Sequence, residues 1–176
     1  LIALFIIPII AYFLFDHSSQ SLIAHDEGLY ARRAKIIVDS DNWFNPFPEA
    51  HHKLVGSYWL IALAIKFLGT TELAVRIPSL IFSILSIFLV YRISEVIFNK
   101  RVAVISTIYL LSTPMWIMYS RYASPDMPFV FSSLLINYSI IEISSESNNR
   151  SRDHYFAFIL GISISLGFLF RTFMIL

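Results

Sequence analysis

Two short polar segments contain the side chains best suited to chemistry, one around Asp26 and the other around Asp126. Lys53 lies between them in the sequence, and Arg171 follows them. A cation can bind a phosphate and stabilise it as a leaving group, whereas a carboxylate can take a proton from a hydroxyl or amine and orient it for attack. If these four side chains meet at one face of a membrane, they suit glycosyl transfer from a lipid phosphate.

Each of these residues also has a simpler explanation. Asp26 can cap a helix whose first turn carries Glu27, and Asp126, between Pro125 and Pro128, can end one helix and begin the next. Transporters also collect ionisable residues in membrane cavities. The individual positions leave both interpretations open, and only the convergence of acids and cations on one side favours a reaction centre.

The composition excludes an ordinary soluble domain. Hydrophobic residues make up 57% of the chain and aromatic residues 16%, against 14% charged residues. A net charge of +1 without a basic stripe argues against nucleic acid as a partner. The absence of cysteine from the sequence excludes disulfides and thiolate metal sites within it.

We therefore expect an all-α, polytopic membrane protein with one domain over residues 1–176. A spanning helix needs about 20 mostly apolar residues. The expected spans are about 1–15, 77–98, 102–119, 128–143 and 154–176, with an outer loop over 16–76. Because the chain starts and stops within apolar sequence, we expect it to be a fragment.

Several local features refine these spans. The apolar run 57–68 is too short to cross a bilayer, so we expect an interfacial or re-entrant helix there. Pro78 suits the first turn of its span, and the spacing of Arg92 and Glu95 predicts an ion pair near the far end.

The topology follows from short basic loops. The loop at Lys100 and the loop at Arg150 both indicate the cytoplasmic side, which places Asp26, Lys53, Asp126 and Arg171 together on the outer side. A plain count of Lys and Arg would favour the opposite orientation. The cations on the predicted outer side that produce this conflict are Arg32, Arg33, Lys35, Lys53 and Arg76.

A series of short motifs runs in order along nearly the whole chain. They are Asp26-Glu27, Tyr30-Ala31, Asp41-Asn42-Trp43, Lys53, Tyr58-Trp59-Leu60, Gly69, Ala74-Val75-Arg76-Ile77-Pro78-Ser79 and Ser124-Pro125-Asp126-Met127-Pro128. Each motif is weak alone, but the ordered set resembles the family of lipid A aminoarabinose transferases and protein O-mannosyltransferases. The resemblance implies a C-type membrane glycosyltransferase fold with juxtamembrane helices in the first outer loop.

The resemblance also implies site residues and substrates. Asp26 and Asp126 match the family's essential outer-face acids, Lys53 matches a lysine near the lipid phosphate, and Arg171 stands where many members have lysine. The implied donor is a polyprenyl-phosphate sugar, and the acceptor is a lipid, a glycan or a protein. The implied location is the plasma (inner) membrane, with the site facing the outside or periplasm.

The sequence departs from the family pattern at two places. Relatives often read Glu-Lys-Pro-Pro where this chain has His52-Lys53-Leu54-Val55, so His52 replaces an acid that can bind a metal. Whether a divalent metal is used therefore stays open, with His52 as its candidate ligand. Near Arg171, Thr172 and Phe173 replace the usual Gly-Pro, which leaves the identity of the donor and acceptor open.

The favoured hypothesis is an inverting sugar transferase. Asp26 is its candidate base, Asp126 is a second acid that shapes the site, and Lys53 and Arg171 hold the donor phosphate. Supporting residues in the first outer loop are Glu27, Tyr30 and Arg32. The alternative is a multi-pass transporter or lipid flippase, in which the same residues would line a path, and a purely structural membrane subunit is the third reading.

Overall fold

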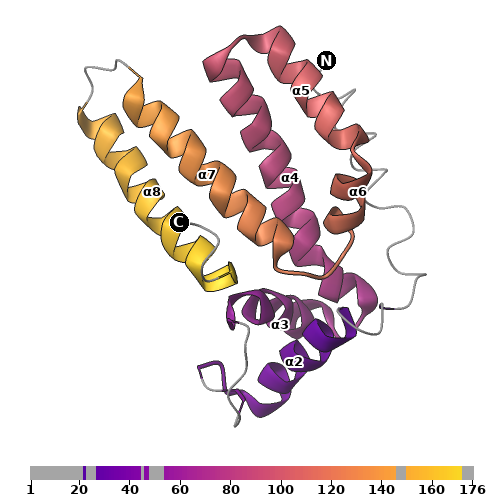
Figure 1. Ribbon diagram of the computed structural model, residues 1–176. Coiled ribbons are helices and arrows are strands. Elements are labelled where there is room, and N and C mark those ends of the chain that lie inside the picture. Colours follow the sequence, from indigo (N-terminus) through magenta and orange to yellow (C-terminus); the bar gives the residue numbers. More distant parts are fainter. Residues whose placement is uncertain (1–21, 23–26, 45, 48–53, 146–149, 172–176) are drawn as a thin grey trace.

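The computed structural model describes residues 22, 27–44, 46–47, 54–145 and 150–171. Every regular element in these residues is an α-helix, as predicted (Figure 1). The helices are α2 (Glu27–Ser40), α3 (Gly56–Leu68), α4 (Glu72–Ile97), α5 (Lys100–Ser112), α6 (Pro114–Ser120), α7 (Asp126–Ser144) and α8 (Arg150–Arg171). The expected span at 1–15 lies outside the described residues.

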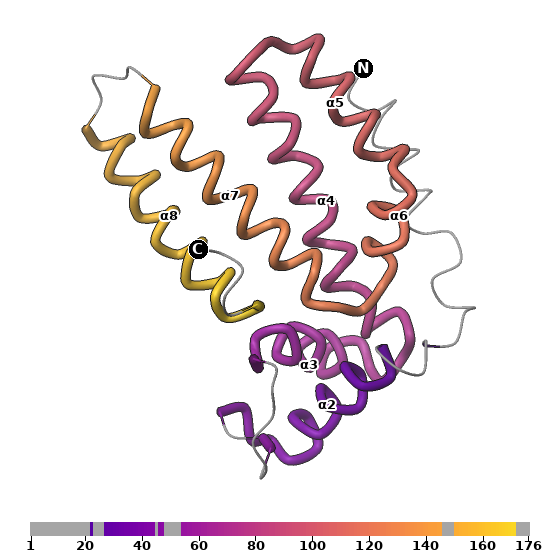
Figure 2. The backbone as a smooth tube through the Cα atoms, viewed as in Figure 1, coloured from indigo at the N-terminus to yellow at the C-terminus, as the bar shows by residue number. Residues whose placement is uncertain are grey.

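The long helices form a bundle that is covered at one end. Helix α4 packs against α5 on one side and α7 on the other, and α7 packs against α8. Helices α2 and α3 pair with each other and lie across one end of the bundle, where α3 contacts α4 and α8 (Figure 1). The tube in Figure 2 shows that the α4–α5 turn and the α7–α8 connection lie at the opposite end.

Local sequence signals determine where the helices around the site begin and end. Gly69 adopts φ +81° after α3, a conformation that glycine adopts without strain. Thr71 then caps α4, because its side chain accepts a hydrogen bond from the Ala74 amide at 3.1 Å. The expectation that Pro78 would occupy the first turn is wrong, because this cap starts α4 at Glu72 and leaves Pro78 inside the helix.

The run 102–119 is broken rather than continuous. Thr113 is extended, with φ −74° and ψ 120°, as the residue before a proline prefers, and Pro114 then opens α6. The two helices α5 and α6 meet at a bend of 70°. The bend brings Trp116 into a buried cluster with Ile87 of α4 and Met127 of α7.

Buried serines allow the bundle helices to approach closely. Ser83 and Ser86 of α4, Ser132 and Ser139 of α7 and Ser163 of α8 are completely buried. Each hydroxyl donates to a carbonyl of the preceding turn in its own helix, at 2.7–3.0 Å. Small side chains whose polar groups are satisfied internally are typical of helix contacts in a bilayer.

The lengths and surfaces of the helices fit a membrane. Helices α4, α7 and α8 are long and apolar enough to span a bilayer, and the bent pair α5–α6 brings the number of candidate spans to four within the described residues. Large apolar side chains on the outside of these helices are well exposed, such as Phe88 at 61% and Phe158 at 69%. Lipid, rather than water, is the solvent that such surfaces favour.

Ion pairs join the helices at the end opposite α2 and α3. The predicted pair of Arg92 and Glu95 is confirmed, at 2.5 Å. Glu142 of α7, whose side chain is 8% exposed, pairs with Arg152 of α8, and Arg152 also donates to the Ser145 hydroxyl at 2.9 Å. These contacts join the end of α7 to the start of α8.

Candidate active site

A buried ion pair joins the first polar segment to the bundle. Arg76 of α4 donates from Nε and Nη2 to the two carboxylate oxygens of Glu27, at 3.0 and 2.9 Å. The two side chains are only 6% and 1% exposed. This bidentate geometry is the strongest form of the arginine–carboxylate pair, and Glu27 follows the candidate base Asp26 directly in the sequence.

The same carboxylate also holds the second polar segment. Glu27 Oε1 accepts a hydrogen bond from the backbone amide of Ala123 at 3.0 Å, across 96 positions of sequence. Ala123 lies three residues before Asp126 in the loop between α6 and α7. One side chain therefore connects both acid-bearing segments to the start of α4.

Ser79 makes a second, weaker connection between α4 and this loop. Its hydroxyl lies 3.4 Å from both the amide nitrogen and the carbonyl oxygen of Ser124. The Ser124 hydroxyl in turn accepts from the Asp126 amide at 3.3 Å. The segment Arg76–Ser79 thus supports the loop at two points, and Asp126 begins α7 directly after it.

Asp126 and Arg171 come together as an ion pair between α7 and the end of α8. The side chains are 25% and 45% exposed, so both can be reached from outside the protein. The end of α8 is held here by α3, because a Cβ on Gly56 would lie 2.8 Å from the backbone oxygen of Leu169. The absence of a side chain at Gly56 permits this approach.

The two supporting residues of α2 beyond Glu27 differ in their surroundings. Tyr30 is 3% exposed and packs against Tyr58 of α3 with ring centroids 5.3 Å apart. Arg33, the neighbour of Arg32, donates to the Tyr58 hydroxyl at 2.8 Å. Tyr30 therefore belongs to the α2–α3 core, whereas the Arg32 side chain is exposed.

Three predicted site residues lie outside the described residues: Asp26, His52 and Lys53. Within the part of the chain that the structure describes, no group of three or more His, Cys, Asp or Glu side chains could hold a metal ion. The roles of these three residues and the use of a metal stay predictions.

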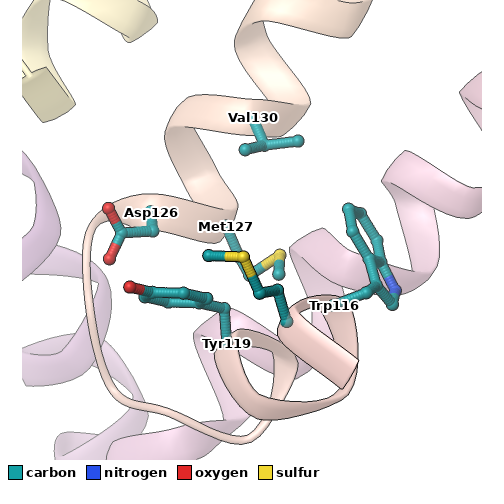
Figure 3. A pocket seen from close by; sticks show the side chains of 6 residues that line it. Trp116, Tyr119, Asp126, Met127 and Val130 are labelled. Atoms are coloured by element: carbon teal, nitrogen blue, oxygen red, sulfur yellow. The ribbon is translucent and has the colours of Figure 1, made fainter. Parts of the chain in front are cut away.

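A cavity of about 290 Å³ adjoins Asp126 (Figure 3). Its wall comes from α6 and the first turns of α7. The lining residues are Met115, Trp116, Tyr119, Asp126, Met127 and Val130. The site thus combines an exposed ion pair with an apolar hollow beside it.

Sequence reasoning did not assign roles to Arg76 or Ser79. Both belong to the motif Arg76-Ile77-Pro78-Ser79 that carried the family resemblance. A signal was present, since a charged residue at the start of a long apolar helix needs a buried partner. The sequence could not show which of the acids in the chain is that partner.

The fold and the site define a multi-pass helical membrane protein in which Glu27, Asp126 and Arg171 lie at the end of the bundle that α2 and α3 cover. The sequence matches the family described as dolichyl-phosphate-mannose-protein mannosyltransferase over residues 52–176. The chain belongs to this family, which confirms the resemblance drawn from the motifs.

Relatives with assigned names support the same family. An undecaprenyl phosphate-alpha-4-amino-4-deoxy-L-arabinose arabinosyl transferase from Wigglesworthia glossinidia brevipalpis is 28% identical over 171 residues, which cover 94% of this chain and 30% of the relative. A protein of the same name from Pseudomonas aeruginosa (strain LESB58) is 26% identical over 169 residues, or 93% of this chain and 30% of the relative. The chain thus spans about a third of the length of these relatives.

Solved structures share the fold. ArnT from Cupriavidus metallidurans bound to undecaprenyl phosphate superposes with a TM-score of 0.90 and 16% identity, over 98% of this chain and 32% of that one. The apo form of the same protein gives a TM-score of 0.89 and covers 33% of its own chain. At this identity the similarity establishes the membrane glycosyltransferase fold and nothing finer.

The buried pair makes a testable prediction about stability. Glu27→Gln removes the negative charge from the buried bidentate pair with Arg76, so the free energy of unfolding should fall by about 2–4 kcal/mol. Asp39→Asn, at an exposed position of α2, should change it by less than about 0.5 kcal/mol. Thermal unfolding of the detergent-solubilised full protein measures both.

The double variant Glu27→Gln/Arg76→Gln tests whether the loss of stability in Glu27→Gln comes from the buried charge of Arg76. Because it removes both buried charges, it should melt above the Glu27→Gln single variant. Equal melting temperatures for Glu27→Gln and Asp39→Asn would show that the pair does not hold the site together.

Proposed function

We propose that this protein transfers a sugar from a polyprenyl-phosphate donor to an acceptor at the outer face of the inner membrane. The observation that carries the proposal is the exposed pair of Asp126 and Arg171, gathered beside the segment that Glu27 anchors. Membership of the mannosyltransferase family and the names of the arabinosyl transferases support the donor class. The acceptor is a lipid, a glycan or a protein.

The proposed reaction inverts the sugar centre in a single displacement. The acceptor hydroxyl or amine attacks the anomeric carbon, the bond from that carbon to the phosphate oxygen breaks, and the polyprenyl phosphate leaves with the bonding electron pair. Asp26 accepts the acceptor's proton, and Asp126 orients the reacting groups. Lys53 and Arg171 stabilise the negative charge of the departing phosphate.

The described geometry supports the role proposed for Arg171. Its guanidinium is almost half exposed, so it can bind a phosphate oxygen while it stays near Asp126. Gly56, three residues after Lys53 in the sequence, contacts Leu169, two residues before Arg171. Helix α3 therefore begins beside the end of α8, an arrangement suited to two cations that serve one phosphate.

A transport path finds less support in the described helices. A path for a polar solute or headgroup needs polar groups available at mid-membrane depth. The buried serines of α4, α7 and α8 instead satisfy their hydroxyls within their own helices. Asn137 likewise donates to the Ser133 carbonyl at 2.8 Å.

Sugar transfer by membranes containing the full protein tests the proposal. Labelled polyprenyl-phosphate sugars serve as donors, and wild type is compared with Asp26→Asn and Asp126→Asn at matched expression. Loss of one essential acid should lower kcat by about 100-fold or more without loss of folding. Full activity in Asp26→Asn would remove its role as the base, and failure of folded wild type with every donor would contradict the function.

A second prediction concerns the donor phosphate. Arg171→Gln removes a charge-assisted hydrogen bond, so the donor KM should rise about tenfold to 100-fold, and Arg171→Lys should show a smaller rise. Because the pair with Asp126 is partly exposed, the melting temperature should hardly change. Arg101→Gln, an exposed position at the other end of the bundle, is the matched control. A donor KM unchanged in Arg171→Gln would exclude contact with the phosphate.

The proposed orientation can be measured by cysteine labelling in intact cells. This chain contains no cysteine, so single cysteines can be introduced into a full protein whose other cysteines are replaced. A membrane-impermeant maleimide should label Asp39→Cys on α2 directly, and Lys100→Cys only after the membrane is permeabilised. The reverse pattern would place the α2–α3 end in the cytoplasm and contradict the proposal.

A further inference from the structure

Helices α7 and α8 are joined by one ion pair near each end. At the end that α2 and α3 cover, Asp126 pairs with Arg171. At the other end, Glu142 of α7 pairs with Arg152 of α8, and we call this contact the far pair. The far pair is more enclosed, because its side chains are 8% and 30% exposed, against 25% and 45% at the site. An enclosed ion pair contributes more to holding two helices together than one that water reaches.

The spacing of the two pairs matches along the helices. Figure 1 shows that α7 and α8 lie side by side and run in opposite directions. Glu142 follows Asp126 by 16 residues on α7, and Arg171 follows Arg152 by 19 residues on α8. At the rise of an α-helix these separations are about 24 and 29 Å, and the long arginine side chains can span the difference. Both pairs therefore form together in one axial register, and a slip by one turn, about 5.4 Å, would move the partners of both apart.

The middle of the interface does little to prevent such a slip. Ser139 of α7 and Ser163 of α8 are completely buried. Their hydroxyls donate to carbonyls of their own helices, at 2.8 and 2.7 Å, so they place no hydrogen bond across the interface. The register of α8 against α7 therefore depends on the ion pairs at the two ends.

Further polar contacts connect the far pair to its neighbours. Arg152 also donates to the Ser145 hydroxyl at 2.9 Å. The Tyr138 hydroxyl interacts with Glu142 on its own helix and with Arg92 on α4. The contacts thus run from α8 through α7 to α4, the helix whose other end carries the buried pair with Glu27. The far pair is tied to the same support as the site.

The pair at the site must also serve the substrate. Under the proposed function, Arg171 shares its guanidinium between Asp126 and the donor phosphate, so their contact weakens when the donor binds. We propose that Glu142 and Arg152 are positioning residues for the donor phosphate, because they keep α8 in register while Arg171 is engaged. This inference rests on the proposed function. Neither residue touches the donor, and both act through α8 from about 29 Å away.

Donor kinetics of the full protein test the proposal. Arg152→Gln should raise the donor KM about fivefold to tenfold and change kcat less, because a displaced Arg171 makes a poorer charge-assisted hydrogen bond to the phosphate. Arg152→Lys keeps the charge and should show a smaller rise. Arg150→Gln, at an exposed position two residues earlier on the same helix, is the matched control and should leave the donor KM unchanged.

A double variant separates positioning from general structural damage. If Arg152 acts through Arg171, its loss has little further effect once Arg171 is absent. The donor KM of Arg152→Gln/Arg171→Gln should therefore equal that of Arg171→Gln within about twofold. Effects that multiply would show that the two residues act independently, and would overturn the proposal.

A distance measurement tests the register without any donor. Met118 of α6 and Phe168 of α8 are 53% and 48% exposed, so spin labels can be attached at Met118→Cys and Phe168→Cys in the full protein with its other cysteines replaced. Pulsed electron paramagnetic resonance in nanodiscs then measures the distance between them. Arg152→Gln should shift or broaden the distribution by at least about 1.5 Å, the rise of one residue, whereas Arg150→Gln should not.

The two measurements distinguish this proposal from the proposed function. An unchanged distance in folded Arg152→Gln would overturn the proposal even if the wild type transfers sugar, and so would a changed distance with an unchanged donor KM. Failure of wild type with every donor would contradict the proposed function, while the distance still decides whether the far pair sets the register. If Arg152→Gln does not fold, Glu142→Gln removes the same pair from α7 and should give the same two changes.

Discussion

The buried pair of Glu27 and Arg76 is the interaction on which the rest of the site depends. Two charges that are 1% and 6% exposed are tolerated because the arginine donates two hydrogen bonds to the carboxylate and the Ala123 amide donates a third. The pair joins α2, α4 and the α6–α7 loop at one point. A shift of α2 or α4 would separate the two charges, and a shift of the loop would break the hydrogen bond from the Ala123 amide, so the three elements hold one another in register.

The helices around the Glu27–Arg76 pair position two side chains that are partly exposed, Asp126 and Arg171. Gly56 lets α3 contact the end of α8 closely, which carries Arg171 to Asp126 at the start of α7. The break before Pro114 turns α6 toward the same place and opens the apolar cavity. Buried charge thus supports this end of the bundle, and partly exposed charge lies beside an apolar cavity at the face to which we assign the proposed reaction.

The ion pairs differ between the two ends of the bundle. At the far end, Arg92 pairs with Glu95 within α4, and Glu142 of α7 pairs with Arg152 of α8. The serines between the two ends bond to their own helices, so the interior offers apolar contact rather than a polar path. The partly exposed pair of Asp126 and Arg171 lies at the end where the α2–α3 pair covers the bundle.

The sequence by itself determined the class of the protein, the all-helical fold, the family and the positions of the acid-bearing segments. These properties follow from hydrophobic run length and from motif order, which are local quantities. Only the tertiary structure decided that Glu27 pairs with Arg76, that Arg171 meets Asp126, and that the run 102–119 bends beside a cavity. The reason is physical: these contacts join residues up to 96 positions apart, and the packing of helices against one another selects among partners that the sequence leaves equivalent.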